Sequence, residues 1–223
     1  MDVNSNTVVV TGFGPFRQHL LNSSWEAAKE LSTLGLGDDV DLHIKELPVA
    51  YQKAKELVCK TWAALQPQSH MEEHNPHVRH PWMQQQEEAF TLMIHIGLVS
   101  TSKAVIILEQ CGKNKGYKEI DVCGFHPEDG CCFSEGPERI ESSINMKTVC
   151  KNIQEEEFDV IFSRDAGRFV CDYTYYTSLY CGHGRAAFIH VPPLSKWVTR
   201  ERLGRVLQAV ILEMLKQCRE ANV

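Results

Sequence analysis

The chain has 223 residues, of which 43% are hydrophobic and 23% are charged, and its formal net charge is −6. This length and composition are typical of one globular domain that folds without disulfides or metals, so we predict a single domain over residues 1–223. The acidic balance argues against a broad basic surface, and we therefore expect neither a nucleic acid nor an acidic membrane as a partner.

The N-terminal segment, the apolar runs and the cysteines bear on the cellular compartment. Residues 1–12 lack the basic start and the apolar run of a signal peptide, and no uncharged apolar run approaches the roughly 18 residues of a transmembrane helix. The nine cysteines are an odd number, which favours reduced thiols in the cytosol. Most of them are expected to be buried, as free cysteines usually are.

Short β-rich runs alternate with helical patterns along the chain. Ser23 and Glu26 have the spacing of a capping box at the start of the first helix. The alternation predicts an α/β sandwich around a largely parallel sheet. The predicted strands cover residues 6–12, 40–49, 92–97, 158–163 and 186–192, and the predicted helices cover residues 23–31, 51–65, 146–153 and 203–215.

Two segments interrupt this alternation. Residues 111–137 contain five glycines and two prolines, and we expect them to be mostly irregular. Residues 69–91 are polar, with two prolines and a glutamine run, and they are predicted to form a mobile surface insertion. In largely parallel sheets functional residues collect at strand ends, so the loops after Val10, Gly97, Ser163 and Val191 are the candidate places for a site.

Cys171 lies in the segment SRDAGRFVCDYTYY (163–176), directly after a predicted strand. A tight turn at Gly167 and a helix from about Arg168 would put this thiol in the first helical turn. There the free N–H groups and the macrodipole favour a thiolate and can stabilise an oxyanion. Composition alone favours a buried structural cysteine over a nucleophile.

Two further residues can complete a catalytic group with Cys171. His190 lies near the end of the 186–192 strand, and adjacent parallel strands would bring it to the thiol, as Cys–His catalysis requires. Glu109 follows the apolar run 103–108 and is a candidate for orienting the imidazole. The alternatives are a core histidine bonded to backbone and a solvated surface glutamate.

Metal sites are the main rival chemistry. The run HMEEH (70–74) matches the zinc-peptidase pattern H-x-x-E-H, but Pro76 and Pro81 interrupt the helix that this motif needs. No C-x-x-C spacing supports a structural zinc at Cys111, Cys123, Cys131 and Cys132. We therefore expect no metal.

The loop TGFGPF (11–16) follows the first strand. It is a poor nucleotide fingerprint, because it has only G-x-G before Pro15. Phe13 and Phe16 could instead wall a small apolar pocket.

Several motifs in the same order resemble the pyroglutamyl-peptidase I family of cysteine peptidases, most nearly its vertebrate members. The resemblance runs through nearly the whole chain. It implies a three-layer α/β/α sandwich around a mostly parallel mixed sheet, no metal or organic cofactor, and removal of N-terminal pyroglutamyl residues from peptides. The motifs are VVVTGFGPF with NSSWEA (22–27), LEQCGKNKGY (108–117), SRDAGRFVCDYTYY (163–176) and FIHVPPL (188–194).

The resemblance also implies roles for individual residues. It makes Cys171 the nucleophile, His190 the general base and acid, and Glu109 the group that orients His190. The pocket that clamps the pyroglutamyl ring would be lined by Phe13, Phe16, Phe169 and Val170.

Two segments depart from the family pattern. The 69–91 segment has no counterpart in it. The segment LVSTSKAVIIL (98–108) lacks the family's glycine and is one residue longer, which could displace Glu109. The alternative function is therefore an impaired homologue that binds N-terminally blocked peptides without efficient turnover.

Overall fold

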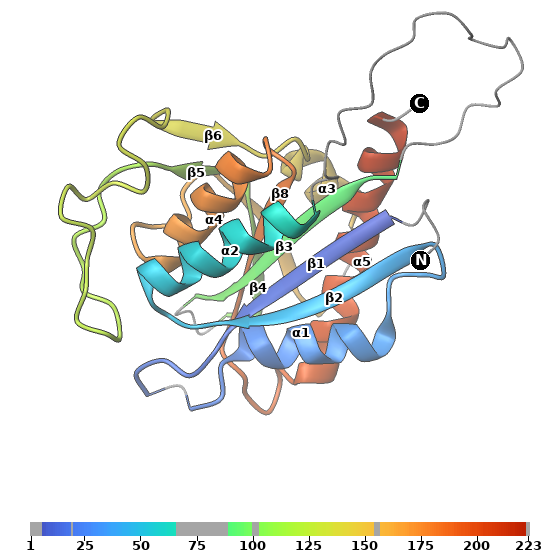
Figure 1. Ribbon diagram of the computed structural model, residues 1–223. Helices are drawn as coiled ribbons and strands as arrows, with labels where there is room; N and C mark the ends of the chain where they lie inside the picture. Colours follow the sequence, from blue (N-terminus) through green and yellow to red (C-terminus); the bar gives the residue numbers. More distant parts are fainter. Residues whose placement is uncertain (1–5, 19, 66–88, 100–102, 154–156, 222–223) are drawn as a thin grey trace, which may run out of the picture.

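Helices cover both faces of one mixed sheet in the computed structural model, which describes residues 6–18, 20–65, 89–99, 103–153 and 157–221 (Figure 1). The sheet order is β2-β1-β3-β8-β4-β7. This arrangement confirms the predicted α/β fold with its mostly parallel mixed sheet. The strands are β1 (Asn6–Phe13), β2 (Val40–Leu47), β3 (Thr91–Leu98), β4 (Val105–Glu109), β7 (Asp159–Ser163) and β8 (Ala186–Val191).

Strands β4 and β7 run against the other four. Strands β2, β1, β3 and β8 are mutually parallel, whereas β4 pairs antiparallel with β8 and parallel with β7. The connection from β3 to β4 spans only residues 99–104, which is too short for the crossover that a parallel strand needs. The loop after Ser163 therefore leaves the sheet at the opposite end from the loops after Gly97 and Val191.

The helices divide into two layers. Helices α1 (Ser23–Leu34), α3 (Met146–Asn152) and α5 (Arg200–Ala221) pack on one face of the sheet, and α2 (Tyr51–Leu65) and α4 (Val170–Cys181) pack on the other (Figure 1). Each layer has its own apolar core. Strands β5 (Cys111–Lys113) and β6 (Arg139–Glu141) form a small antiparallel pair beside α4, and the chain between them is mostly irregular, as predicted.

Asn22, rather than Ser23, caps the first helix. Its side chain accepts a hydrogen bond from Ser24 N at 3.1 Å, so the predicted capping box of Ser23 and Glu26 was wrong. The Asn22 amide also donates to Gly14 O at 2.9 Å. One side chain thus starts α1 and holds the loop that follows β1.

The cysteines are less buried than predicted. Cys111 and Cys132 are buried and Cys123 is exposed, while the other six are partly exposed, because they lie at helix surfaces and in loops. None of the described helices combines the length and the apolar character needed to cross a membrane. The predicted insertion at 69–91, with its HMEEH run, lies outside the described residues except for residues 89–91.

Candidate active site

Cys171 is the second residue of α4. The helix begins at Val170, two residues later than predicted, after an extended N-cap residue, Phe169, that makes no side-chain capping bond. Helix α4 packs on one face of the sheet, and its first turn places Cys171 against β3. The first-turn N–H groups of such a helix have no partner within it.

Gly97 leaves the space that the thiol occupies. A Cβ at this position would lie 3.0 Å from Cys171 Sγ and 2.6 Å from the Phe188 ring. Gly97 is paired with His190 on the neighbouring strand. The thiol and the imidazole therefore meet over adjacent residues of β3 and β8. Cys171 lies in the first turn of a helix, as predicted. The expected adjacent parallel strands are not found, because β4 separates β7 from β8 and β7 runs antiparallel to β8.

The His190 ring lies between Glu109 and Cys171. Its Nδ1 donates to Glu109 Oε1 at 2.9 Å. Because Nδ1 is engaged with a carboxylate, Nε2 is the nitrogen left to face the thiol. Burial lowers the pKa of His190, but its interactions with Cys171 and Glu109 outweigh burial and raise that pKa to about 9.

Glu109 reaches His190 because β4 runs antiparallel to β8. Glu109 is paired with Phe188 on β8. Phe188 lies two residues before His190 and on the same face of the sheet. Tyr175 Oη fixes the end of this strand by donating to Glu109 O at 2.8 Å. The carboxylate is buried, and its second oxygen, Oε2, has no partner among the described residues. The altered 98–108 segment has therefore not kept Glu109 from His190.

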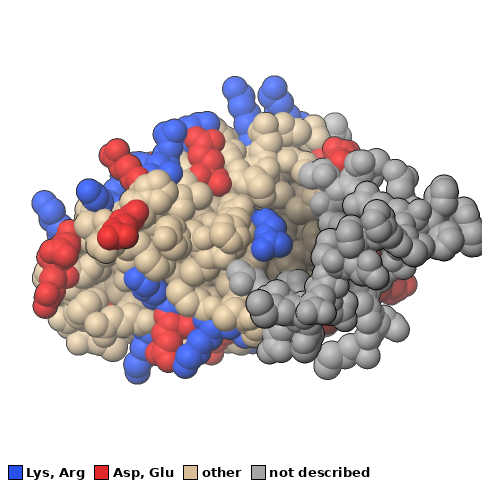
Figure 2. Space-filling model, turned by 45° about the horizontal axis from the view of Figure 1, so that its top comes forward, with Lys and Arg blue, Asp and Glu red and all other residues tan. Residues whose placement is uncertain are grey.

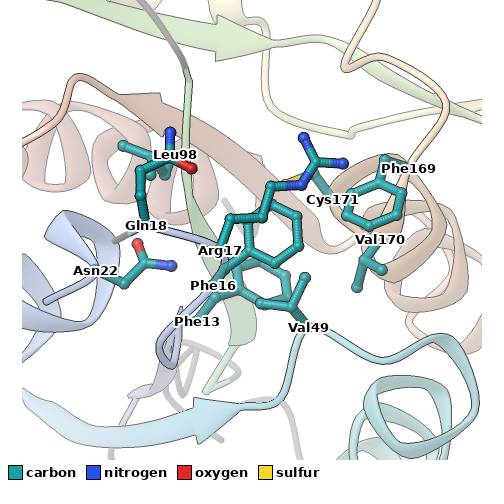
Figure 3. Close-up of a pocket in the computed structure, with 10 residues that line it drawn as sticks. All are labelled: Phe13, Phe16, Arg17, Gln18, Asn22, Val49, Leu98, Phe169, Val170 and Cys171. Atoms are coloured by element: carbon teal, nitrogen blue, oxygen red, sulfur yellow. The ribbon is translucent and has the colours of Figure 1, made fainter. Parts of the chain in front are cut away.

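A small cavity of about 100 Å³ opens beside the thiol (Figure 3). The ring centres of Phe16 and Phe169 lie 5.6 Å apart at the sides of the cavity. All four residues predicted for the pocket line it together with Cys171, and five further lining residues were not predicted. The complete lining is Phe13, Phe16, Arg17, Gln18, Asn22, Val49, Leu98, Phe169, Val170 and Cys171.

The pocket wall that follows β1 is held by short hydrogen bonds. Phe13 N donates to Ser24 Oγ at 2.9 Å, and Gly14 N donates to Leu47 O at 3.0 Å. Together with the Asn22 bond to Gly14 O, these contacts fix the loop to both α1 and β2. Asn22 belongs to the segment NSSWEA, so the sequence held a signal for it, but its double role emerges only from the fold.

Asp172 is a buried carboxyl directly after the thiol. It accepts hydrogen bonds from Tyr117 Oη at 3.0 Å and Lys113 N at 3.3 Å, and Arg168 lies 3.7 Å away. Burial raises its pKa to about 7, although these partners oppose the shift. Asp172 ties the first turn of α4 to the segment after β5, and sequence reasoning missed it because its partners are distant in the chain.

No three His, Cys, Asp or Glu side chains gather as a metal site in the described part of the chain. The four cysteines considered for a structural zinc do not form such a group.

The fold and the site together define a class. A thiol beside a buried histidine that is paired with a carboxylate, at the mouth of a small apolar pocket, is the arrangement of a cysteine-type hydrolase. Residues 6–216 match the family model for pyroglutamyl peptidase, peptidase C15. The chain belongs to the pyroglutamyl peptidase family.

Known relatives are similar to this chain over most of their length. The chain is 47% identical to human pyroglutamyl-peptidase 1 over 96% of this chain and 92% of the relative. It is also 47% identical to human pyroglutamyl-peptidase 1-like protein, over 84% and 85%. The structure of pyrrolidone carboxyl peptidase from Thermococcus litoralis matches with a TM-score of 0.76 over 97% of this chain and 96% of that one. At 18% identity, this last match speaks for the fold alone.

Proposed function

We propose that the protein removes N-terminal pyroglutamyl residues from peptides, with Cys171 as nucleophile, His190 as general base and acid, and Glu109 as the residue that orients His190. The observation that carries this proposal is the buried hydrogen bond between His190 and Glu109 beside the Cys171 thiol. Family membership supports the reaction class.

Attack begins from the thiol and imidazole as a pair. His190 accepts the proton of Cys171, and its raised pKa favours this transfer, which leaves a thiolate. The thiolate adds to the carbonyl carbon that links pyroglutamate to the next residue. Negative charge then develops on the carbonyl oxygen, within reach of the N–H groups in the first turn of α4.

Collapse of this intermediate releases the peptide. His190 donates its proton to the leaving amine, and the pyroglutamyl group stays on Cys171 as a thioester. A water molecule, deprotonated by His190, hydrolyses the thioester and frees pyroglutamate. The negative charge of Glu109 stabilises the imidazolium and keeps its Nε2 aimed at the thiol.

The pocket chemistry suits an uncharged lactam. Phe13, Phe16, Phe169 and Val170 offer aromatic and aliphatic surface to a ring that has no free amine and little charge. Discrimination against prolyl peptides follows, since a secondary ammonium would lose its hydration in this pocket without gaining a carboxylate partner.

Hydrolysis of pyroglutamyl-aminomethylcoumarin by the purified protein tests the proposal. We expect turnover that iodoacetamide abolishes and that Cys171→Ala lacks. A folded protein that binds 2-pyrrolidone but shows no turnover would support the binding-only alternative. Turnover that persists in Cys171→Ala and is lost to a chelator would overturn the cysteine mechanism.

A further inference from the structure

Arg17 is the single charged side chain among the residues that line the described pocket. The lactam ring assigned to this pocket is neutral, so it does not need a cation for binding. We therefore look for a group outside the lactam ring, elsewhere in the ligand, that a guanidinium beside the thiol would bind.

The backbone holds Arg17 in an unusual conformation. Its φ is +51°, a left-handed value that long side chains rarely adopt. Its guanidinium carbon lies 4.7 Å from the centre of the Phe16 ring. In Figure 3 the side chain extends over Phe16 toward the end of the pocket where Cys171 and Phe169 lie. The turn thus directs the cation across the pocket mouth.

The ion pair between Arg17 and Glu119 is weak. Glu119 Oε2 lies 3.6 Å from Arg17 Nη2, and the two side chains are 66% and 60% exposed. Exposed ion pairs of this kind contribute little and exchange readily. Glu119 stays near the pocket because its backbone oxygen accepts a bond from Tyr51 Oη at 3.1 Å. A ligand carboxylate can therefore take the place of the Glu119 carboxylate.

Basic and acidic side chains are otherwise mixed around the described face shown in Figure 2, without a continuous basic patch on it. A general attraction of anions to that face is therefore not expected.

We propose that Arg17 is a specificity-determining residue that binds a carboxylate adjoining the lactam ring. This inference rests on the proposed function. With the ring in the pocket and its carbonyl at Cys171, the neighbouring position holds either the residue that follows pyroglutamate or, after hydrolysis, the carboxylate of pyroglutamate itself. Arg17 thus favours peptides with an acidic second residue and retains the free acid product.

Calorimetric titration separates Arg17 from the rest of the pocket. The probes are 5-oxoproline and 2-pyrrolidone, which share the lactam ring and differ in the carboxylate. We expect 5-oxoproline to bind the wild type about three- to tenfold more tightly, with the difference shrinking as salt is added. Arg17→Gln should remove the difference and leave 2-pyrrolidone binding unchanged.

Two further variants sharpen this test. Glu119→Gln removes the competing carboxylate while keeping Arg17, so it should strengthen 5-oxoproline binding alone. Arg219→Gln is the matched control, because this arginine pairs with Asp39 at the C-terminal end of α5 and does not line the pocket. It should leave both affinities as in the wild type.

Hydrolysis of pyroglutamyl-aspartyl amide and pyroglutamyl-asparaginyl amide distinguishes the two sources of the carboxylate. A higher kcat/KM for the aspartyl substrate that Arg17→Gln abolishes assigns Arg17 to the substrate's second residue. Equal kcat/KM values with an Arg17-dependent affinity for 5-oxoproline assign it to the product.

The outcomes also separate this inference from the proposed function. If both ring compounds bind equally well to the wild type and to Arg17→Gln, the inference is overturned while the ring pocket stands. If Glu119→Gln leaves 5-oxoproline binding unchanged, competition for Arg17 is refuted. If neither compound binds, the proposed function fails, and the inference fails with it.

Discussion

Glu109 and His190 form a buried hydrogen bond of 2.9 Å between two neighbouring strands that run in opposite directions. The antiparallel register places the carboxylate two residues before the imidazole on one face of the sheet. The second carboxylate oxygen has no partner among the described residues, which is costly for a buried group. A residue held at such a cost is explained by its effect on His190 rather than by stability.

Glu109→Gln tests this relationship. The amide keeps the size of the side chain but removes the charge that raises the pKa of His190, so that pKa should fall. We expect kcat to drop by roughly 10² to 10⁴, on the scale known for triad carboxylates, and the alkaline limb of kcat/KM to move to lower pH. Glu135→Gln, at an exposed position, is the control. An unchanged pH profile would mean that Glu109 does not act through His190.

Gly97→Ala tests the space around the thiol. The new methyl group would meet the Phe188 ring at 2.6 Å and Cys171 Sγ at 3.0 Å, so one of them must move. A displacement of this size can lower kcat by up to about 10²-fold. Circular dichroism should show a folded protein, and site-resolved alkylation should show altered reactivity of Cys171. Full activity in this variant would show that the thiol tolerates displacement.

Phe16 and Phe13 should respond differently to truncation. Phe16 lies at the pocket wall and is partly exposed, so Phe16→Ala should raise KM for a pyroglutamyl substrate with little loss of stability. Phe13 is 2% exposed and belongs to the core, so Phe13→Ala should also lower the free energy of unfolding by roughly 3–5 kcal/mol. Urea titrations together with steady-state kinetics check both. Equal destabilisation by the two changes would contradict this division.

Asp172 should make stability depend on pH. Its pKa is about 7 in the folded protein, above the usual 3.8, so the folded state binds the extra proton between these values. Stability should therefore fall as the pH rises from about 4 to 7. Asp172→Asn removes this titration and should flatten the dependence, which urea unfolding at pH 5 and pH 8 would show. A slope equal to that of the wild type would indicate that Asp172 is not responsible.

The sequence predicted the elements well but not their directions. Apolar periodicity located five of the six strands of the main sheet within a few residues, because burial leaves a local pattern. Strand β4 was recognised only as an apolar run. No local sequence pattern showed that β4 and β7 run antiparallel to the other strands, since strand direction depends on how connections pass over the sheet.

The candidate site shows the same division. Cys171, His190 and the pocket phenylalanines lie in motifs that the sequence displays, so they could be proposed in advance. Gly97 and Asp172 depend on contacts between segments far apart in the chain, and Arg17 depends on a backbone angle. Such features emerge only when the segments are assembled.

Hydrolysis of paired coumarin substrates tests the central claim most directly. The measurement is kcat/KM for pyroglutamyl-aminomethylcoumarin and for prolyl-aminomethylcoumarin, with the wild type and with Cys171→Ala. We predict that the wild type cleaves the pyroglutamyl compound and rejects the prolyl one, and that Cys171→Ala cleaves neither. Equal cleavage of both compounds, or pyroglutamyl cleavage that survives loss of the thiol, would contradict the account.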